Sequence, residues 1–188
     1  MNQVTNKTNQ LRDFYNQSWT NALANQREDF GDLEASLQFI EQNNISRESK
    51  ILEIGCAIGK LCHELSIKGF DDVVGIDISE RAIQYGKAKY PHLALHSYEG
   101  SDLSFLEGNF DICLSFDVVE HIPDINRHFQ SVIKILNPSG KYLFQTPNIL
   151  SNSVVETIKN KGKMTWKIYH PSLQSSFSLK KKTDSSWF

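Results

Sequence analysis

Residues 51–59 read Ile-Leu-Glu-Ile-Gly-Cys-Ala-Ile-Gly, an apolar run that passes directly into a turn with two glycines. A short apolar run bounded by glycine predicts a buried strand. Gly55 and Gly59 allow a sharp bend and a close approach to a ligand, because neither carries a β-carbon. A helix predicted to begin at about Gly59 would point its free N–H groups toward the same ligand. The stretch therefore predicts a cofactor-binding turn.

The spacing of the turn indicates which cofactor it does not fit. The dinucleotide fingerprint needs glycine at its first and third positions and glycine or alanine at its sixth, which here fall on Gly55, Ala57 and Lys60. The sixth position fails. Glycine remains at the first and fifth positions, with Glu53 two residues before the first. A glycine turn that closes any α/β unit is the alternative at this stage.

A second apolar run, residues 72–77, ends in a carboxylate 22 positions after Gly55. This is close to the roughly 20 residues expected for a ribose-binding acid in a nucleotide-binding βαβ unit. Carboxylate oxygens can accept both hydrogen bonds of a cis-diol, so Asp77 is a candidate ribose ligand. The alternative is that Asp77 or Ser79 caps the helix predicted over residues 79–89, and Ser79 can do so by itself.

The pattern resembles the first motif of class I S-adenosylmethionine-dependent methyltransferases, acidic-x-Gly-x-Gly-x-Gly, with Ala57 in place of the middle glycine. The resemblance implies that the loop passes under the methionine end of the cofactor and that Glu53 helps to hold its ammonium. The cofactor-binding residues expected in this part of the chain are Glu53, Gly55, Cys56, Ala57, Gly59, Asp77 and Ile78.

A third strand, expected around residues 93–96, precedes a polar loop over residues 99–108. The methyltransferase family places an acid and an apolar residue here, matched by Asp102 and Leu103. The resemblance implies that the Asp102 side chain accepts from the adenine amino group and that the next backbone N–H donates to the ring. The alternative is that Asp102 caps a short turn.

The apolar run 110–116 predicts a central parallel strand, and it leads into Glu-His-Ile-Pro-Asp at residues 120–124. This resembles the fourth motif of the ubiquinone-biosynthesis and small-molecule methyltransferases. It implies that Phe116 packs on the cofactor and that Asp117 lies beside the methyl-transfer site. His121 or Asp117 is the candidate base for an acceptor hydroxyl. Alternatively, Phe116 is ordinary core and the Glu-His pair only shapes the loop.

Strands alternate with helices over roughly residues 50–148, and the last landmark is a Pro-Ser-Gly turn at 138–140 before a strand over 141–146. This alternation predicts an α/β fold: a Rossmann-like open parallel sheet with helices on both faces and the ligand at the carboxyl ends of the strands. The full methyltransferase fold continues with a helix and two antiparallel strands. Only 42 residues remain, with few apolar stretches, so we expect the C-terminal strands to be incomplete.

The chain divides into an N-terminal helical cover (1–45), an S-adenosylmethionine-binding core (46–150) and a basic, partly irregular tail (151–188). Helices are expected over residues 8–25, 32–43 and 124–136, the last with Asp124 as its N-cap. The aromatic residues of the first helix either line the cofactor pocket or pack against the core. They are Phe14, Tyr15 and Trp19.

Composition bounds the remaining possibilities. A chain of 188 residues suits one domain, and we find no export signal or membrane span, so a cytoplasmic location is expected. Three cysteines in apolar segments are interpreted as reduced, with no metal-ligand spacing. Residues 1–150 carry a net charge of −7 and residues 151–188 one of +5. The basic tail is a solvated segment or an attraction site for anions, and nothing resembles a nucleic-acid platform.

These features predict methyl transfer from S-adenosylmethionine to a small-molecule acceptor, and the motifs favour O-methylation by resemblance. One alternative is a cofactor-binding module without turnover that acts through a partner. Another is an NAD-dependent oxidoreductase, which the start of the βαβ unit and Asp77 fit but Lys60 does not. An exposed fifth strand would be a reason for homodimerisation or partner contact.

Overall fold

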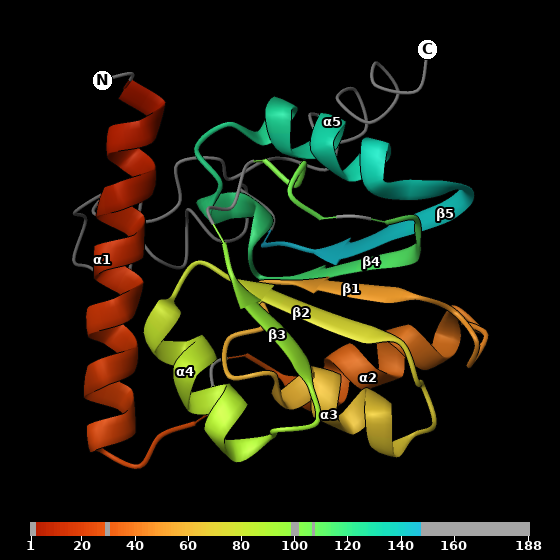
Figure 1. The fold of residues 1–188 in the computed structure, drawn as a ribbon, viewed down its shortest axis with the longest axis horizontal. Coiled ribbons are helices and arrows are strands. Elements are labelled where there is room, and N and C mark those ends of the chain that lie inside the picture. Colours follow the sequence, from red (N-terminus) through yellow and green to blue (C-terminus); the bar gives the residue numbers. More distant parts are fainter. Residues whose placement is uncertain (1–2, 29–30, 99–101, 107, 148–188) are drawn as a thin grey trace.

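A five-stranded parallel sheet, in the order β3-β2-β1-β4-β5, forms the centre of the molecule (Figure 1). The computed structural model describes residues 3–28, 31–98, 102–106 and 108–147. This arrangement confirms the expected Rossmann-like α/β fold. The strands are β1 (Ile51–Ile54), β2 (Val73–Asp77), β3 (Ala94–Ser97), β4 (Phe110–Phe116) and β5 (Leu136–Gln145).

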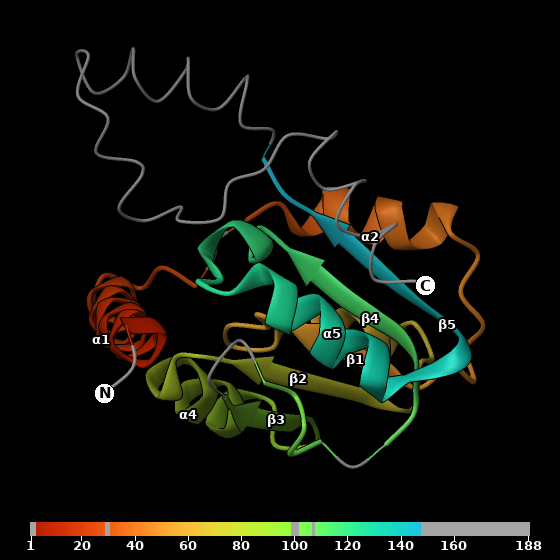
Figure 2. The same ribbon diagram turned by 90° about the horizontal axis from the view of Figure 1, so that it is seen from above.

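Helices cover both faces of the sheet, because the central strands are apolar on both sides. On one face α2 and α3 pack against a core that includes Ile51 and Leu114. On the other face α5 packs against Leu52 and Cys113 (Figures 1 and 2). The helices are α1 (Gln3–Ala24), α2 (Leu33–Gln42), α3 (Lys60–Ile67), α4 (Glu80–Lys89) and α5 (Ile125–Ile135), with a 3₁₀ turn, η1, at Val119–His121.

Side-chain caps fix where three of these helices begin. Asp32, Ser79 and Asp124 each accept a hydrogen bond from the backbone N–H three residues later. Each bond satisfies one of the free donors of a helix N-terminus. The expected caps at Ser79 and Asp124 are confirmed, and Ser79 rather than Asp77 caps α4.

Helix α1 lies beside the carboxyl ends of the strands, where the ligand was expected (Figure 2). Trp19 is buried against Ile58 and Ala82. The Asn16 side-chain oxygen accepts hydrogen bonds from the Ser79 hydroxyl (3.0 Å) and the Arg81 N–H (3.2 Å). These contacts attach α1 to the start of α4.

Some predicted boundaries were wrong. Helix α1 begins at Gln3 rather than residue 8, and β3 lies one residue later than expected. Strand β5 begins directly after α5 at Leu136, not at Lys141. Leu136 pairs with Phe110 and Lys141 with Ile112, so the Pro-Ser-Gly segment forms an irregularity within the strand and not a turn before it.

In the ranges that the structure describes, no helix is long and apolar enough to cross a membrane. Strand β5 borders the sheet within these ranges. The expectations for the tail (151–188), including incomplete C-terminal strands, fall outside them. Dimerisation through a sheet edge remains a prediction.

Gly86 provides a test of the packing between α4 and the loop after β1. A β-carbon at this position would lie 2.4 Å from the Ile58 carbonyl oxygen and 2.9 Å from the Leu95 Cδ1. Gly86→Ala should therefore lower the free energy of unfolding by about 1–3 kcal/mol, even though alanine is the better helix former by about 1 kcal/mol. Urea denaturation measures the change. The exposed Gln84→Ala in the same helix should stay within about 0.5 kcal/mol of wild type. A Gly86→Ala protein as stable as wild type would contradict this packing.

Candidate functional site

A pocket of about 510 Å³ opens at the carboxyl ends of β1, β2 and β4. This volume lies within the range of small-molecule and cofactor sites. Its floor comes from the loops after these strands, and α1 and the start of α2 complete its walls. The pocket therefore lies at the place where open parallel sheets bind ligands.

The loop after β1 adopts left-handed backbone conformations at Gly55 (φ +82°), Ala57 (φ +53°) and Gly59 (φ +80°). A β-carbon on Gly55 would lie 2.2 Å from the Val118 Cγ2, and one on Gly59 would lie 2.9 Å from the Leu95 side chain. Both glycines thus make room for the protein's own side chains. Gly55, Cys56 and Ala57 line the pocket, whereas Gly59 lies outside its lining and is the N-cap residue that precedes α3.

Asp77 lies at the end of β2 and lines the pocket next to Ile78. Its two carboxylate oxygens accept hydrogen bonds from the N–H groups of Ala57 (2.9 Å) and Ser79 (2.7 Å). Burial raises the pKa of Asp77, and these two bonds oppose the rise. Each carboxylate oxygen has a second lone pair, so the group can still accept from a diol.

Glu53 is 6% exposed and lines the floor of the pocket. The Cys62 thiol donates to its Oε2 at 2.9 Å. Burial raises the pKa of Glu53 to about 7, and the nearby Asp77 charge adds to the rise. All three cysteines are buried and free, as expected for reduced apolar residues. Glu53 is therefore a carboxyl group that a nearby cation would readily ionise.

Asp102 and Leu103 lie outside the pocket lining. The Asp102 carboxylate accepts from the Ser104 N–H (3.0 Å) and the Arg127 guanidinium (2.5 Å), and hydrogen bonds from these residues lower its pKa to about 2. Leu103 is fully buried in the core on the α5 face. The structure thus places Asp102 in a short turn, and its contact with adenine remains a prediction.

Tyr98 is a lining residue that the sequence analysis missed. It follows β3 directly and stacks on Phe105, with ring centroids 5.1 Å apart. Its position is that of the other lining residues, just past a strand end. An aromatic side chain there is the signal that could have identified it.

The opposite end of the pocket lies past β4. Phe116 lines the pocket and makes an edge contact with Phe39 of α2, with ring centroids 6.0 Å apart. Asp117 has φ +54°, and its N–H donates to the Gln145 carbonyl at 3.0 Å. The backbone bond joins the loop after β4 to the end of β5. Gln145 also lines the pocket.

His121 of η1 lines the same end, and its ring makes an edge contact with Tyr15 of α1 at 5.7 Å. The neighbouring Glu120 is 1% exposed, and burial raises its pKa to about 7. One Glu120 oxygen accepts from the Thr146 hydroxyl at 2.8 Å, and the other lies 3.9 Å from His121 Nε2. An imidazole held in this way can take a proton from a bound acceptor.

The aromatic residues of the first helix line the pocket as one alternative expected, although Trp19 also packs in the core. Lining residues from the start of α2 were not expected, since that helix was assigned only to the cover. They are Asp32, Leu33 and Ser36. Within the described ranges, no group of three or more His, Cys, Asp or Glu side chains has metal-binding geometry.

Comparison with known proteins identifies the family. A family model described as a methyltransferase domain matches residues 25–182. The chain is 31% identical over 140 residues to phosphoethanolamine N-methyltransferase 1 of Arabidopsis thaliana, covering 70% of this chain and 28% of that protein. It is also 31% identical over 116 residues to ubiquinone biosynthesis O-methyltransferase of Coxiella burnetii, covering 60% of this chain and 49% of that one. The chain thus spans half or less of the length of these relatives.

Solved structures share the fold. The YcgJ protein of Bacillus subtilis is 13% identical with a TM-score of 0.67, covering 82% of this chain and 68% of that one. An S-adenosylmethionine-dependent methyltransferase of Mesorhizobium loti is 21% identical with a TM-score of 0.57, covering 65% and 59%. Together with the glycine loop and the family model, these likenesses show that the chain belongs to the class I S-adenosylmethionine-dependent methyltransferase family.

Proposed function

We propose that this chain binds S-adenosylmethionine in the pocket at the strand ends and transfers its methyl group to a hydroxyl of a small molecule. One observation carries the proposal. The pocket joins the glycine loop and two buried carboxyl groups at its floor to a histidine and aromatic side chains at its other end. The first set suits the cofactor, and the second suits an acceptor.

The residues present fit the cofactor's chemistry. Glu53 would hold the ammonium, since it lies beside the glycine loop and a bound cation would favour its ionised form. Asp77 would accept from the ribose hydroxyls with its remaining lone pairs. Ile78 and Tyr98 would lie against the adenosine end, and the loop of Gly55, Cys56 and Ala57 would lie under the methionine end.

When bound, the cofactor supplies an electrophilic methyl group on a sulfonium. The chain's own residues orient the acceptor and exclude water. Holding two reacting groups in near-attack geometry contributes on the order of 7–11 kcal/mol in favourable intramolecular cases. Phe116 would pack on the cofactor and, together with Tyr15, would position the acceptor. His121 would take the proton of the acceptor's hydroxyl.

Two features favour O-methylation. The Glu-His-Ile-Pro-Asp segment at residues 120–124 resembles that of small-molecule O-methyltransferases. One of the similar proteins is a ubiquinone biosynthesis O-methyltransferase. The contrasting hypothesis is a module that binds the cofactor without turnover. An oxidoreductase would instead require affinity for NAD, and the loop spacing speaks against it.

S-adenosylhomocysteine, the product form of the cofactor, tests the proposal directly. At 100 times its dissociation constant it should raise the free energy of unfolding by about 2.7 kcal/mol, measured by thermal or urea denaturation. In a separate assay, transfer of a labelled methyl group from S-adenosylmethionine to phenolic acceptors should also be detected. Binding without any transfer would favour the module, and no binding would refute the proposal.

Ile78 separates cofactor contact from general packing. Ile78→Ala removes apolar surface from the pocket wall, and burial of such groups contributes about 0.8 kcal/mol per CH₂. We expect S-adenosylhomocysteine to bind roughly tenfold more weakly, by isothermal titration calorimetry. The matched control is Ile67→Ala, since Ile67 is 65% exposed and outside the pocket lining. Equal weakening in both variants would show that the effect is not local.

Glu53 gives a pH dependence. Its pKa of about 7 leaves it half protonated in the free protein at neutral pH, and a bound ammonium favours the ionised form. Binding of S-adenosylhomocysteine should therefore release protons and weaken about fivefold from pH 7 to pH 6. Isothermal titration calorimetry at each pH, in two buffers of different ionisation enthalpy, measures the number of protons released and the dissociation constant.

Glu53→Gln should remove this dependence. Glu120→Gln is the matched control, because burial also raises the pKa of Glu120 to about 7. It should retain the pH dependence, because Glu120 lies outside the pocket lining. If the pH dependence disappeared only in the Glu120 variant, the released proton would come from Glu120, and the role of Glu53 would be contradicted.

A further inference from the structure

We infer that the acceptor end of the pocket selects against negative charge, so that the methyl acceptor is an uncharged or cationic aromatic alcohol and not a phosphate ester or a carboxylate. This inference rests on the proposed function and specifies its substrate. It comes from the charges and the apolar surfaces that line the pocket beyond the cofactor-binding loop.

The acceptor end is defined by six lining residues from α1, the start of α2, the end of β4 and the segment after β4. Two aromatic contacts join these elements. Tyr15 meets His121 at 5.7 Å, and Phe116 meets Phe39 of α2 at 6.0 Å. The six residues are Tyr15, Asp32, Leu33, Phe116, Asp117 and His121.

The charges of the pocket are unbalanced. Among the described lining residues, the carboxyl groups are Glu28, Asp32, Glu53, Asp77 and Asp117, whereas Lys60 is the only lysine or arginine. Glu28 is bound by the Tyr85 hydroxyl (2.5 Å) and by Lys89. Glu53 and Asp77 are assigned to the cofactor. Asp32 and Asp117 are the two carboxyl groups that line the acceptor end.

A helix N-terminus is often where a protein binds an anion, because its N–H groups and its dipole are positive. Helix α2 begins at this pocket, but Asp32 already accepts from the Ala35 N–H at 3.0 Å. The Asp32 carboxylate occupies the helix end that a phosphate would otherwise use. Its negative charge makes this part of the pocket unfavourable for an anion.

The rest of the acceptor end is apolar and partly aromatic. Tyr15, Leu33 and Phe116 line it, and Tyr15 and Phe116 are each held by an edge contact with another ring. Flat apolar molecules pack well against such surfaces. His121 at the same end would accept the proton of a hydroxyl. A phenolic body without negative charge satisfies all of these features.

Three phenols whose side chains end in a neutral, a cationic and an anionic group test the inference. They are para-ethylphenol, tyramine and para-hydroxyphenylpropionate, in which the same two-carbon unit follows the ring and carries hydrogen, an ammonium and a carboxylate, respectively. Binding to the full chain saturated with S-adenosylhomocysteine is measured by calorimetry at low ionic strength, since salt screens such effects. We expect the anionic probe to bind at least about tenfold more weakly than the other two.

The outcomes separate this inference from the proposed function. If S-adenosylhomocysteine does not bind, the proposed function fails, and the inference fails with it. If it binds but the anionic probe binds as tightly as para-ethylphenol, or no probe binds, only the inference is overturned.

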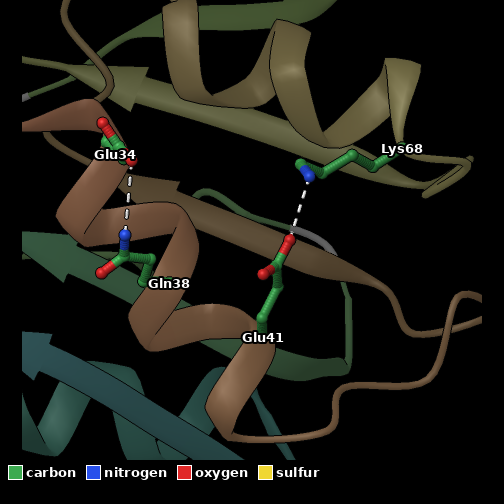
Figure 3. Close-up of polar contacts among 4 residues, drawn as sticks. All are labelled: Glu34, Gln38, Glu41 and Lys68. Carbon is green, nitrogen blue, oxygen red and sulfur yellow. Dashed lines mark hydrogen bonds and ion pairs between the residues drawn. The ribbon is translucent and has the colours of Figure 1, made fainter.

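Paired substitutions identify the source of the selection. The double variant Asp32→Asn and Asp117→Asn removes both charges, while asparagine still caps a helix and tolerates the left-handed conformation at position 117. The ratio of the dissociation constant of the anionic probe to that of para-ethylphenol should fall at least about threefold in the double variant. The control is Glu41→Gln, which removes a charge from the same helix α2 where Glu41 pairs with Lys68 at 2.9 Å, outside the pocket lining (Figure 3). An unchanged ratio in the double variant would overturn the inference.

Discussion

The Asp77 carboxylate connects the parts from which the site is built. One oxygen accepts from the Ala57 N–H in the loop after β1, and the other accepts from the Ser79 N–H at the start of α4. Ser79 in turn caps α4 and donates to Asn16 of helix α1. A single buried acid therefore joins the glycine loop to the end of β2 and, through Ser79, to helix α1 in the pocket wall. Hydrogen bonds to a charged acceptor are among the stronger ones, so this small network can hold a loop that contains three left-handed residues.

The glycine loop shows how one sequence pattern meets two requirements. Its glycines were expected to let the backbone approach a ligand. In the structure the space beside Gly55 is filled by Val118, and that beside Gly59 by Leu95. The absence of a β-carbon thus allows the loop to pack against the segment after β4 and against β3. Ala57 follows the same left-handed path, and as a residue with a β-carbon it does so at a conformational cost of about 1–2 kcal/mol.

The sequence predicted the features that depend on local patterns. The apolar runs at residues 51–54 and 110–116, the helix caps at Ser79 and Asp124, and the acid at the end of β2 are all set by spacing within a few residues. The missed features depend on distant partners. Strand β5 begins at Leu136 because Phe110 pairs with it, and Asp102 points to Arg127, which lies 25 residues away in the sequence. The lining contribution of α2 likewise needs the fold, since nothing near Asp32 indicates that its helix starts at a pocket.

The two buried acids of the pocket, Glu53 and Asp77, differ in how their negative charge is stabilised. Two buried carboxyl groups near one another would repel if both were ionised, and burial alone disfavours the charge. Asp77 accepts from the N–H groups of two residues, whereas the hydrogen bonds to Glu53 come from Cys62, and burial raises the pKa of Glu53 to about 7. The free protein can therefore keep Glu53 protonated and avoid the repulsion. A cationic group bound beside Glu53 would reverse the balance, because it stabilises the ionised form.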